Sequence, residues 1–162
     1  MSDGPPASAA AVSLFEAGRR TEGEDARAAL SLFAQCVASA PGWSAPVVAL
    51  GDLLQKFGRT DEALVAYGRA FELDPKDAII PVKSGNLRNQ IQDYAAAVRD
   101  YEAASAARPD WYLPDLNRGN ALGAQGDLDG AEQAYDRALE KGGPAGIRLR
   151  RDLRLPIIPE GE

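Results

Sequence analysis

The sequence predicts an all-α protein, a right-handed α-solenoid of four helix-turn-helix hairpins closed by a short C-terminal capping helix. The first observation behind this prediction is a period of 34 residues, because prolines stand at Pro41, Pro75 and Pro109. The second is that small and aromatic residues recur at fixed distances before each proline, and before Gly143, where the next step of the period falls. A repeat of this length is typical of stacked helical hairpins.

Four columns of similar residues run through the four repeat units. The columns are counted back from each of the three prolines and from Gly143. An alanine stands 12 residues before each of these positions, an aromatic residue stands 8 before, and small residues stand 24 and 5 before. In that column order the members are Ala29, Ala63, Ala97 and Ala131; Phe33, Tyr67, Tyr101 and Tyr135; Ala17, Gly51, Gly85 and Gly119; and Cys36, Ala70, Ala104 and Ala138. Small residues let helix axes approach closely. The aromatic column is predicted to fill the space between a hairpin and its neighbour.

Each unit is predicted to hold two antiparallel helices joined by a tight turn. We expect the helix pairs at residues 8–20 with 25–39, 45–57 with 60–73, 78–91 with 94–107, and 112–125 with 128–141. The proline after each second helix ends it, because proline has no backbone N–H to donate. In the turns, Thr60 or Asp61 and Asp127 are the expected N-caps, whose side-chain oxygens accept hydrogen bonds from free N–H groups.

The repeats divide the chain into three parts. Residues 1–7, rich in Gly, Pro and Ser, are expected to be disordered. Residues 8–144 are the predicted repeat domain, with units at about 10–43, 44–77, 78–111 and 112–144. Residues 145–162 are the predicted capping helix and tail, where Leu149 and Leu153 stand four apart and would lie together on the uncovered face of the last hairpin.

The repeated pattern resembles the tetratricopeptide repeat family. The second unit matches that family's pattern best, at Leu50, Gly51, Ala63, Tyr67, Ala70 and Pro75. The resemblance covers residues from about 10 to 144. It departs at Ala17 and Cys36 in the first unit, at Ser84 and Arg88 in the third, and at Arg118 in the fourth. The resemblance implies a protein-binding function, in which the first helix of each pair lines a concave groove.

The resemblance also implies which residues face that groove. They are Asp52, Gln55 and Lys56 in the second unit, Lys83, Asn86, Asn89 and Gln90 in the third, and Asn117 and Asn120 in the fourth. Asparagine amides both donate and accept hydrogen bonds, so they suit the backbone of an extended peptide. The two lysines could meet a carboxylate. The alternative is that these polar residues form a solvated face with no ligand.

Some members of the family grip a terminal carboxylate with lysine and asparagine side chains. Asn86 and Asn117 match two of those positions. However, Val82 stands where the first lysine is needed, and no further repeat follows to supply the last basic pair. We therefore do not expect this chain to bind chaperone tails through that arrangement.

Composition excludes several function classes. The chain has no histidine and one cysteine, which removes the usual general base at neutral pH and the commonest zinc ligands. No catalytic, cofactor or metal site is expected, and Cys36 is interpreted as a core residue. With a net charge of −6, the chain is not expected to bind nucleic acid. There is no apolar run near the roughly 20 residues that a membrane span needs, nor a basic secretory leader, so we expect a cytoplasmic protein.

A second resemblance concerns the C-terminal segment. Residues 146–160 look like the junction between repeats and catalytic domain in bacterial relatives of the O-GlcNAc transferase and SPINDLY type. The resemblance implies that this chain would recruit the substrate protein for an O-linked glycosyltransferase without being an enzyme itself. The leading hypothesis is thus a scaffold that binds a partner peptide or protein, as a monomer or with weak self-association. The alternative is a structural protein that self-associates or bridges the subunits of a complex.

Overall fold

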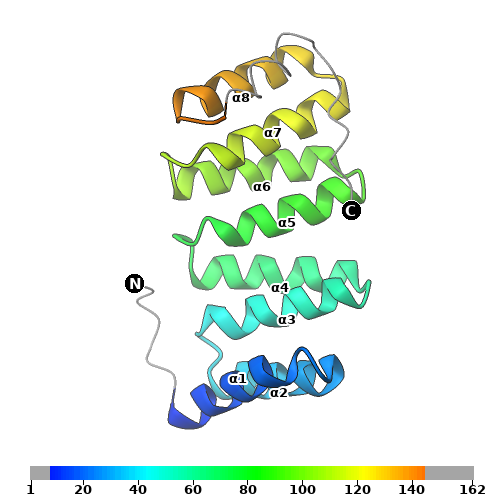
Figure 1. Cartoon of the computed structure of the whole chain (residues 1–162), viewed down its shortest axis with the longest axis vertical. Helices are drawn as coiled ribbons and strands as arrows, with labels where there is room; N and C mark the ends of the chain where they lie inside the picture. The colour runs from blue at the N-terminus through cyan, green and yellow to red at the C-terminus, as the bar shows by residue number, and fades with distance from the viewer. Residues whose placement is uncertain (1–7, 145–162) are drawn as a thin grey trace. The chain divides into compact units, whose positions relative to one another are not determined.

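The computed structural model describes residues 8–144, and these are all-helical, without a strand (Figure 1). The helices are α1 (Ala9–Thr21), α2 (Ala26–Ser39), α3 (Ser44–Lys56), α4 (Thr60–Leu73), α5 (Ile79–Gln90), α6 (Tyr94–Ala107), α7 (Tyr112–Gln125) and α8 (Leu128–Glu140). Every one of them begins and ends within one residue of its predicted bounds. The all-α prediction is therefore confirmed. The predicted disordered start and capping helix lie outside the described residues.

The chain divides into two compact units, Met1–Ile80 and Pro81–Glu162. In the first unit α1 packs on α2, α2 on α3, and α3 on α4. In the second unit α6 packs on α7, and α7 on α8. Antiparallel hairpins and their neighbours thus form the core of each unit.

A buried aromatic ring of the second helix lies against a glycine of the first helix in each hairpin. A Cβ atom built on Gly51 would lie 2.8 Å from the Tyr67 ring, and one built on Gly85 would lie 2.7 Å from the Tyr101 ring. Only glycine leaves room for a ring at this approach. The Tyr101 ring also reaches the next hairpin, as predicted, because it clusters with Ala121 of α7.

The first hairpin corrects the predicted column, because its packing glycine is Gly18 and not Ala17. A Cβ atom on Gly18 would lie 2.6 Å from the Phe33 ring, whereas Ala17 is only partly buried. The α1 helix ends three residues after its glycine, while α3 ends five residues after Gly51. The part of α1 after its glycine is thus two residues shorter than the corresponding part of α3. The connection between α1 and α2 is only one residue longer than the connection between α3 and α4. The small residue therefore stands one position later in the first unit.

The helix caps agree with the prediction at one turn and correct it at another. Asp127 caps α8, since its Oδ1 accepts a hydrogen bond of 2.9 Å from the Gly130 N–H. Neither Thr60 nor Asp61 caps α4: Thr60 is already the first helical residue, and the N-cap position is taken by Arg59, which makes no side-chain cap. Arg59 instead pairs with Glu62 across one turn of helix.

Three polar residues that stand at apolar columns, Ser84, Arg88 and Arg118, lie close to polar groups of neighbouring residues. Arg88 Nε lies 3.0 Å from an Asp100 carboxylate oxygen, and an Arg118 Nη lies 3.6 Å from Glu102. The buried Ser84 hydroxyl donates to the Pro81 carbonyl at 3.2 Å. These contacts explain how the third and fourth units tolerate residues that their family pattern does not favour.

Cys36 is a core residue, as predicted. Its side chain is fully buried, and its Sγ donates to the Ala11 carbonyl oxygen at 3.2 Å. Burial raises the pKa of the Cys36 thiol, which favours its protonated form.

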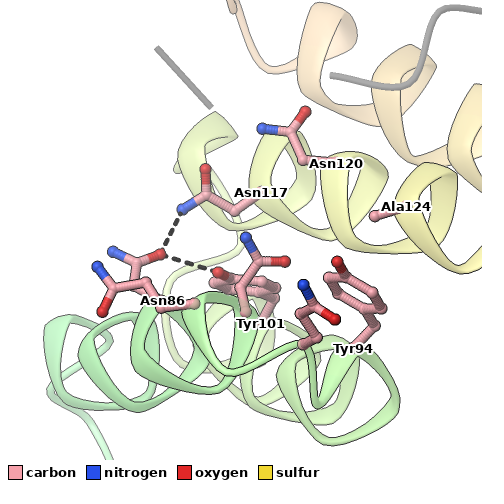
Figure 2. Close-up of a pocket in the computed structure, with 9 residues that line it drawn as sticks. Asn86, Tyr94, Tyr101, Asn117, Asn120 and Ala124 are labelled. Carbon is pink, nitrogen blue, oxygen red and sulfur yellow. Dashed lines mark hydrogen bonds between the residues drawn. The ribbon is translucent and has the colours of Figure 1, made fainter. Parts of the chain in front are cut away.

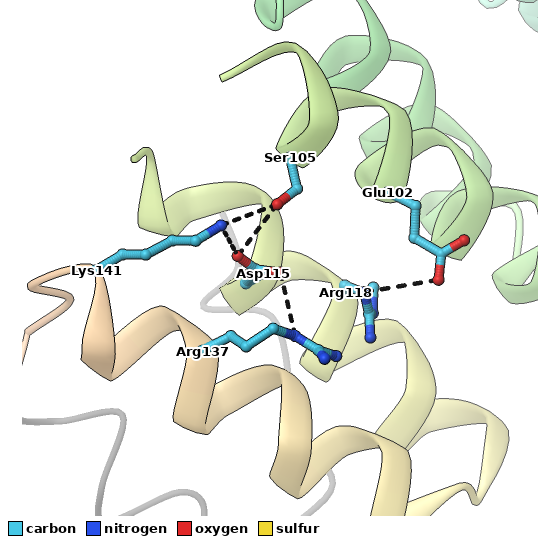
Figure 3. A network of polar contacts seen from close by, with 6 residues as sticks. All are labelled: Glu102, Ser105, Asp115, Arg118, Arg137 and Lys141. Atoms are coloured by element: carbon cyan, nitrogen blue, oxygen red, sulfur yellow. Dashed lines mark hydrogen bonds and ion pairs between the residues drawn. The ribbon is translucent and has the colours of Figure 1, made fainter. Parts of the chain in front are cut away.

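A buried ion pair ties the two ends of the last hairpin together (Figure 3). Asp115, in the first turn of α7, is 1% exposed and forms an ion pair with Lys141, which follows α8. Ser105 of α6 donates to the same carboxylate at 3.3 Å, and Arg137 Nε lies 3.8 Å from its other oxygen. This network therefore joins α6, α7 and the end of α8.

No helix among the described residues is both long and apolar enough to cross a membrane. The same residues contain no group of three or more metal-ligating side chains that could hold a metal ion.

Candidate functional site

Amide side chains line a pocket of about 600 Å³ in the second unit, which we call the amide pocket (Figure 2). It is open to solvent and is formed by α5, α6, α7 and the α5–α6 turn. The lining residues are Asn86, Asn89, Gln90, Gln92, Tyr94, Tyr101, Asn117, Asn120 and Ala124.

Helical spacing brings these side chains to one place. Residues three, four or seven apart lie on the same face of a helix. On α7, Asn117, Asn120 and Ala124 therefore point the same way, and on α6 Tyr94 and Tyr101 do. Asn86, Asn89 and Gln90 share a face of α5 in the same manner. The pocket is where these three faces meet.

Asn86 is the centre of the hydrogen bonds in the pocket. Its Oδ1 accepts a hydrogen bond of 2.8 Å from the Tyr101 hydroxyl and one of 3.2 Å from the Asn117 Nδ2, both drawn in Figure 2. Asn120 Oδ1 accepts a hydrogen bond of 3.0 Å from the Tyr135 hydroxyl. These bonds hold three of the pocket's amides in fixed orientations.

A buried acceptor in the pocket has no donor among the described residues. The Asn89 Oδ1 atom is buried and accepts no hydrogen bond from the described residues. A buried polar atom without a partner costs about 1–3 kcal/mol. A ligand that brought an N–H or O–H group to this oxygen would remove that cost.

The pocket's chemistry is polar without being charged. None of the lining residues is acidic or basic. Burial, and to a smaller extent the charge of Asp100, raises the pKa of Tyr101, so its hydroxyl stays a proton donor at neutral pH. The arrangement can therefore form hydrogen bonds with a ligand, but it presents no ionised group to one.

Five of the nine residues predicted to bind a peptide line this pocket, and four do not. Those in the pocket are Asn86, Asn89, Gln90, Asn117 and Asn120. Of the others, Asp52 and Gln55 accept hydrogen bonds of 2.7 and 3.0 Å from the Tyr67 hydroxyl in the first unit. Lys56 Nζ lies 2.6 Å from a Glu22 carboxylate oxygen. Lys83 is a partly buried residue of α5 that does not line the pocket.

The sequence prediction missed four residues of the pocket. Gln92, Tyr94 and Ala124 were not predicted, and Tyr101 was assigned to the core alone. The available signal was the spacing of seven residues between Tyr94 and Tyr101 and between Asn117 and Ala124. This spacing puts both members of each pair on one helix face.

Comparison with known proteins identifies the repeats. A family model described as the tetratricopeptide repeat matches residues 47–77 and 116–140, so these two segments are tetratricopeptide repeats. RNA polymerase II-associated protein 3 of Xenopus tropicalis is 33% identical over 85 residues, which cover 52% of this chain. The matched segment spans only 13% of the length of that protein.

Solved structures show the same fold. A tetratricopeptide repeat protein from Parabacteroides merdae is 20% identical, with a TM-score of 0.79 over 91% of this chain and 59% of that one. The first repeat domain of Spaghetti (RPAP3), bound to the HSP90 peptide SRMEEVD, is 22% identical, with a TM-score of 0.61 over 68% of this chain and 89% of that one. The predicted class, an α-solenoid of tetratricopeptide hairpins, is confirmed by these matches.

The second predicted resemblance has no such support. None of the proteins just named is described as a glycosyltransferase. Residues 146–160, which carry the resemblance to a repeat-to-transferase junction, lie outside the described residues. It stays a hypothesis from the sequence.

Proposed function

We propose that this chain is a protein-interaction scaffold, and that the amide pocket binds an extended, uncharged segment of a partner protein. The observation that carries the proposal is the amide cluster around Asn86, with the unpartnered acceptor of Asn89 beside it. Tetratricopeptide repeats in the chain support the class of function, since a relative with this fold is described as bound to a peptide.

The chemistry of the pocket matches the needs of a peptide backbone. Each peptide unit brings one N–H donor and one C=O acceptor, and both need partners when they leave water. Six lining residues carry amide side chains, each able to donate and to accept. The pocket can therefore replace the water around an extended segment without demanding a particular side chain.

The same chemistry argues against a charged ligand. A charge taken out of water without a counter-charge is costly. The peptide SRMEEVD bound by the Spaghetti domain carries two glutamates, one aspartate and one arginine. In this chain, Val82 occupies the position of the first lysine in the carboxylate-binding arrangement and is only 6% exposed. We propose that the bound segment is internal to its partner and neutral where it enters the pocket.

The experiment uses fluorescein-labelled 12-residue peptides selected from a random phage-display library on the wild-type chain. Fluorescence anisotropy then measures their affinity for wild type and for Asn86→Ala with Asn117→Ala. Losing hydrogen bonds at both residues is expected to weaken binding about tenfold or more, because each is worth about 0.5–1.5 kcal/mol. Far-ultraviolet circular dichroism checks that the variant is folded.

A matched control removes two amides elsewhere in the second unit. Gln125 and Gln133 are exposed and do not line the pocket, so Gln125→Ala with Gln133→Ala should leave the affinity unchanged. Labelled SRMEEVD should bind more weakly than the selected peptides. If wild type and the asparagine variant bound every selected peptide with equal affinity, the peptides would bind outside the amide pocket.

A further inference from the structure

A tyrosine hydroxyl and a hydrogen-bond acceptor occur together in three of the hairpins. The acceptor is the residue directly after the packing glycine: Asp52 pairs with Tyr67, Asn86 with Tyr101, and Asn120 with Tyr135, at 2.7, 2.8 and 3.0 Å. In the first hairpin the ring belongs to Phe33, which has no hydroxyl. The residue after its glycine is Arg19, which lies 3.8 Å from Glu22 instead.

The Tyr67–Asp52 pair of the first unit shows which residue donates in this tyrosine hydrogen bond. A carboxylate such as Asp52 has no proton to give, so the Tyr67 hydroxyl must donate. Burial, followed by the hydrogen bond to Asp52 and its charge, raises the pKa of Tyr67, which keeps that proton in place. Tyr101 stands in the same geometry toward Asn86, and burial raises its pKa too.

This direction decides which end of each asparagine is occupied within the protein and which end can still bind a ligand. The Asn86 amide is planar, with its oxygen and nitrogen on opposite sides. Two donors, the Tyr101 hydroxyl and the Asn117 Nδ2, hold its oxygen. The Asn86 Nδ2 lies on the side of the amide away from Tyr101 and Asn117 (Figure 2). Because Asn86 is exposed, this N–H group is left to donate to a ligand. The Tyr135 hydroxyl holds the oxygen of Asn120 in the same way.

We propose that the hydroxyls of Tyr101 and Tyr135 set the hydrogen-bonding polarity of the amide pocket. They hold Asn86 and Asn120 with their N–H groups left for the bound segment, so that these two amides recognise its carbonyl oxygens, while the Asn89 oxygen remains an acceptor. This inference rests on the proposed function. The two tyrosines are positioning residues, because they act through the asparagines. The type of residue directly after the packing glycine decides whether a hairpin can donate to a ligand carbonyl, because a side chain such as Asp52 has no N–H group.

The first test removes the hydroxyls and keeps the rings. Tyr101→Phe with Tyr135→Phe is expected to fold, because Phe33 already fills the equivalent place beside Gly18. Binding of the library-selected peptides should weaken about three- to tenfold. Tyr67→Phe is the matched control: it loses the same kind of bond in the first unit, outside the pocket, and should leave the affinity unchanged.

A double-mutant cycle separates positioning from general destabilisation. If Tyr101 acts through Asn86, then Tyr101→Phe weakens binding in the wild-type background but has no further effect in the Asn86→Ala background. Asn86→Asp, which places at 86 the residue type native at 52, should weaken binding about tenfold. In ¹⁵N-edited NMR spectra, Tyr101→Phe should shift the side-chain amide signals of Asn86.

The outcomes are distinguishable from failure of the proposed function. If Asn86→Ala with Asn117→Ala leaves binding unchanged, the pocket is not the binding site. If those substitutions weaken binding but Tyr101→Phe with Tyr135→Phe does not, the pocket binds and this inference alone is wrong. An equal loss from Tyr101→Phe with and without Asn86 would also overturn it.

Discussion

The ring of Tyr101 occupies the space that any side chain at residue 85 would need. A Cβ atom on Gly85 would lie 2.7 Å from a ring carbon, closer than real Cβ atoms come to other atoms. The ring is 2% exposed, and its hydroxyl is held by Asn86. It therefore has little freedom to move aside.

Gly85→Ala should accordingly destabilise the protein. Overpacking of a buried contact costs about 1–3 kcal/mol, so we expect the free energy of unfolding measured by urea denaturation to fall by that amount. Gly68→Ala is the control: Gly68 is exposed within α4, with nothing within 4 Å of an added Cβ atom. There alanine should stabilise by about 0.5–1 kcal/mol, because glycine is a poor helix former. Equal effects of the two substitutions would contradict this account.

The buried ion pair of Asp115 and Lys141 gives a second prediction. Asp115→Ala leaves the Lys141 ammonium, whose side chain is 20% exposed, without its partner and should cost about 3–5 kcal/mol. Asp115→Leu with Lys141→Met replaces both charges by apolar groups, so it should recover a large part of that loss. Chemical denaturation of the single and double variants measures the coupling. If the loss of unfolding free energy in the double variant equalled the sum of the losses in the single variants, Asp115 and Lys141 would not be coupled.

Alkaline pH should weaken the protein through Tyr67. Burial, together with Asp52, raises the pKa of Tyr67 above its ordinary value of 10.0. Below pH 10 the hydroxyl is neutral in both states, and its contribution to stability is fully present. Above pH 10 the unfolded chain ionises at this residue while the folded chain does not, so stability falls by up to about 1.4 kcal/mol per pH unit.

The measurement compares wild type with Tyr67→Phe. Their difference in the free energy of unfolding should be largest at neutral pH and should shrink between pH 10 and pH 11.5. Other groups that titrate in this range are common to both proteins and cancel in the difference. A difference independent of pH would show that Tyr67 ionises equally in the folded and unfolded chains.

Much of the fold could be predicted because each helix is a local structure. Its ends depend on residues close by in the chain, such as Asp127 at the start of α8, and the 34-residue period repeats the small and aromatic residues that two helices need to pack. The prediction failed at Ala17, because α1 ends sooner after its packing glycine, Gly18, than α3 ends after Gly51. No local pattern announces that shift.

The sequence by itself determined the helical hairpins and the amide-rich character of the third and fourth units. Only the tertiary structure decided which amides meet, which oxygen each tyrosine hydroxyl holds, and that Lys56 pairs with Glu22. The physical reason is distance along the chain. Asn86 and Asn117 are 31 residues apart, and Asn86 and Tyr101 are 15 apart, so their hydrogen bonds exist only once separate helices have packed.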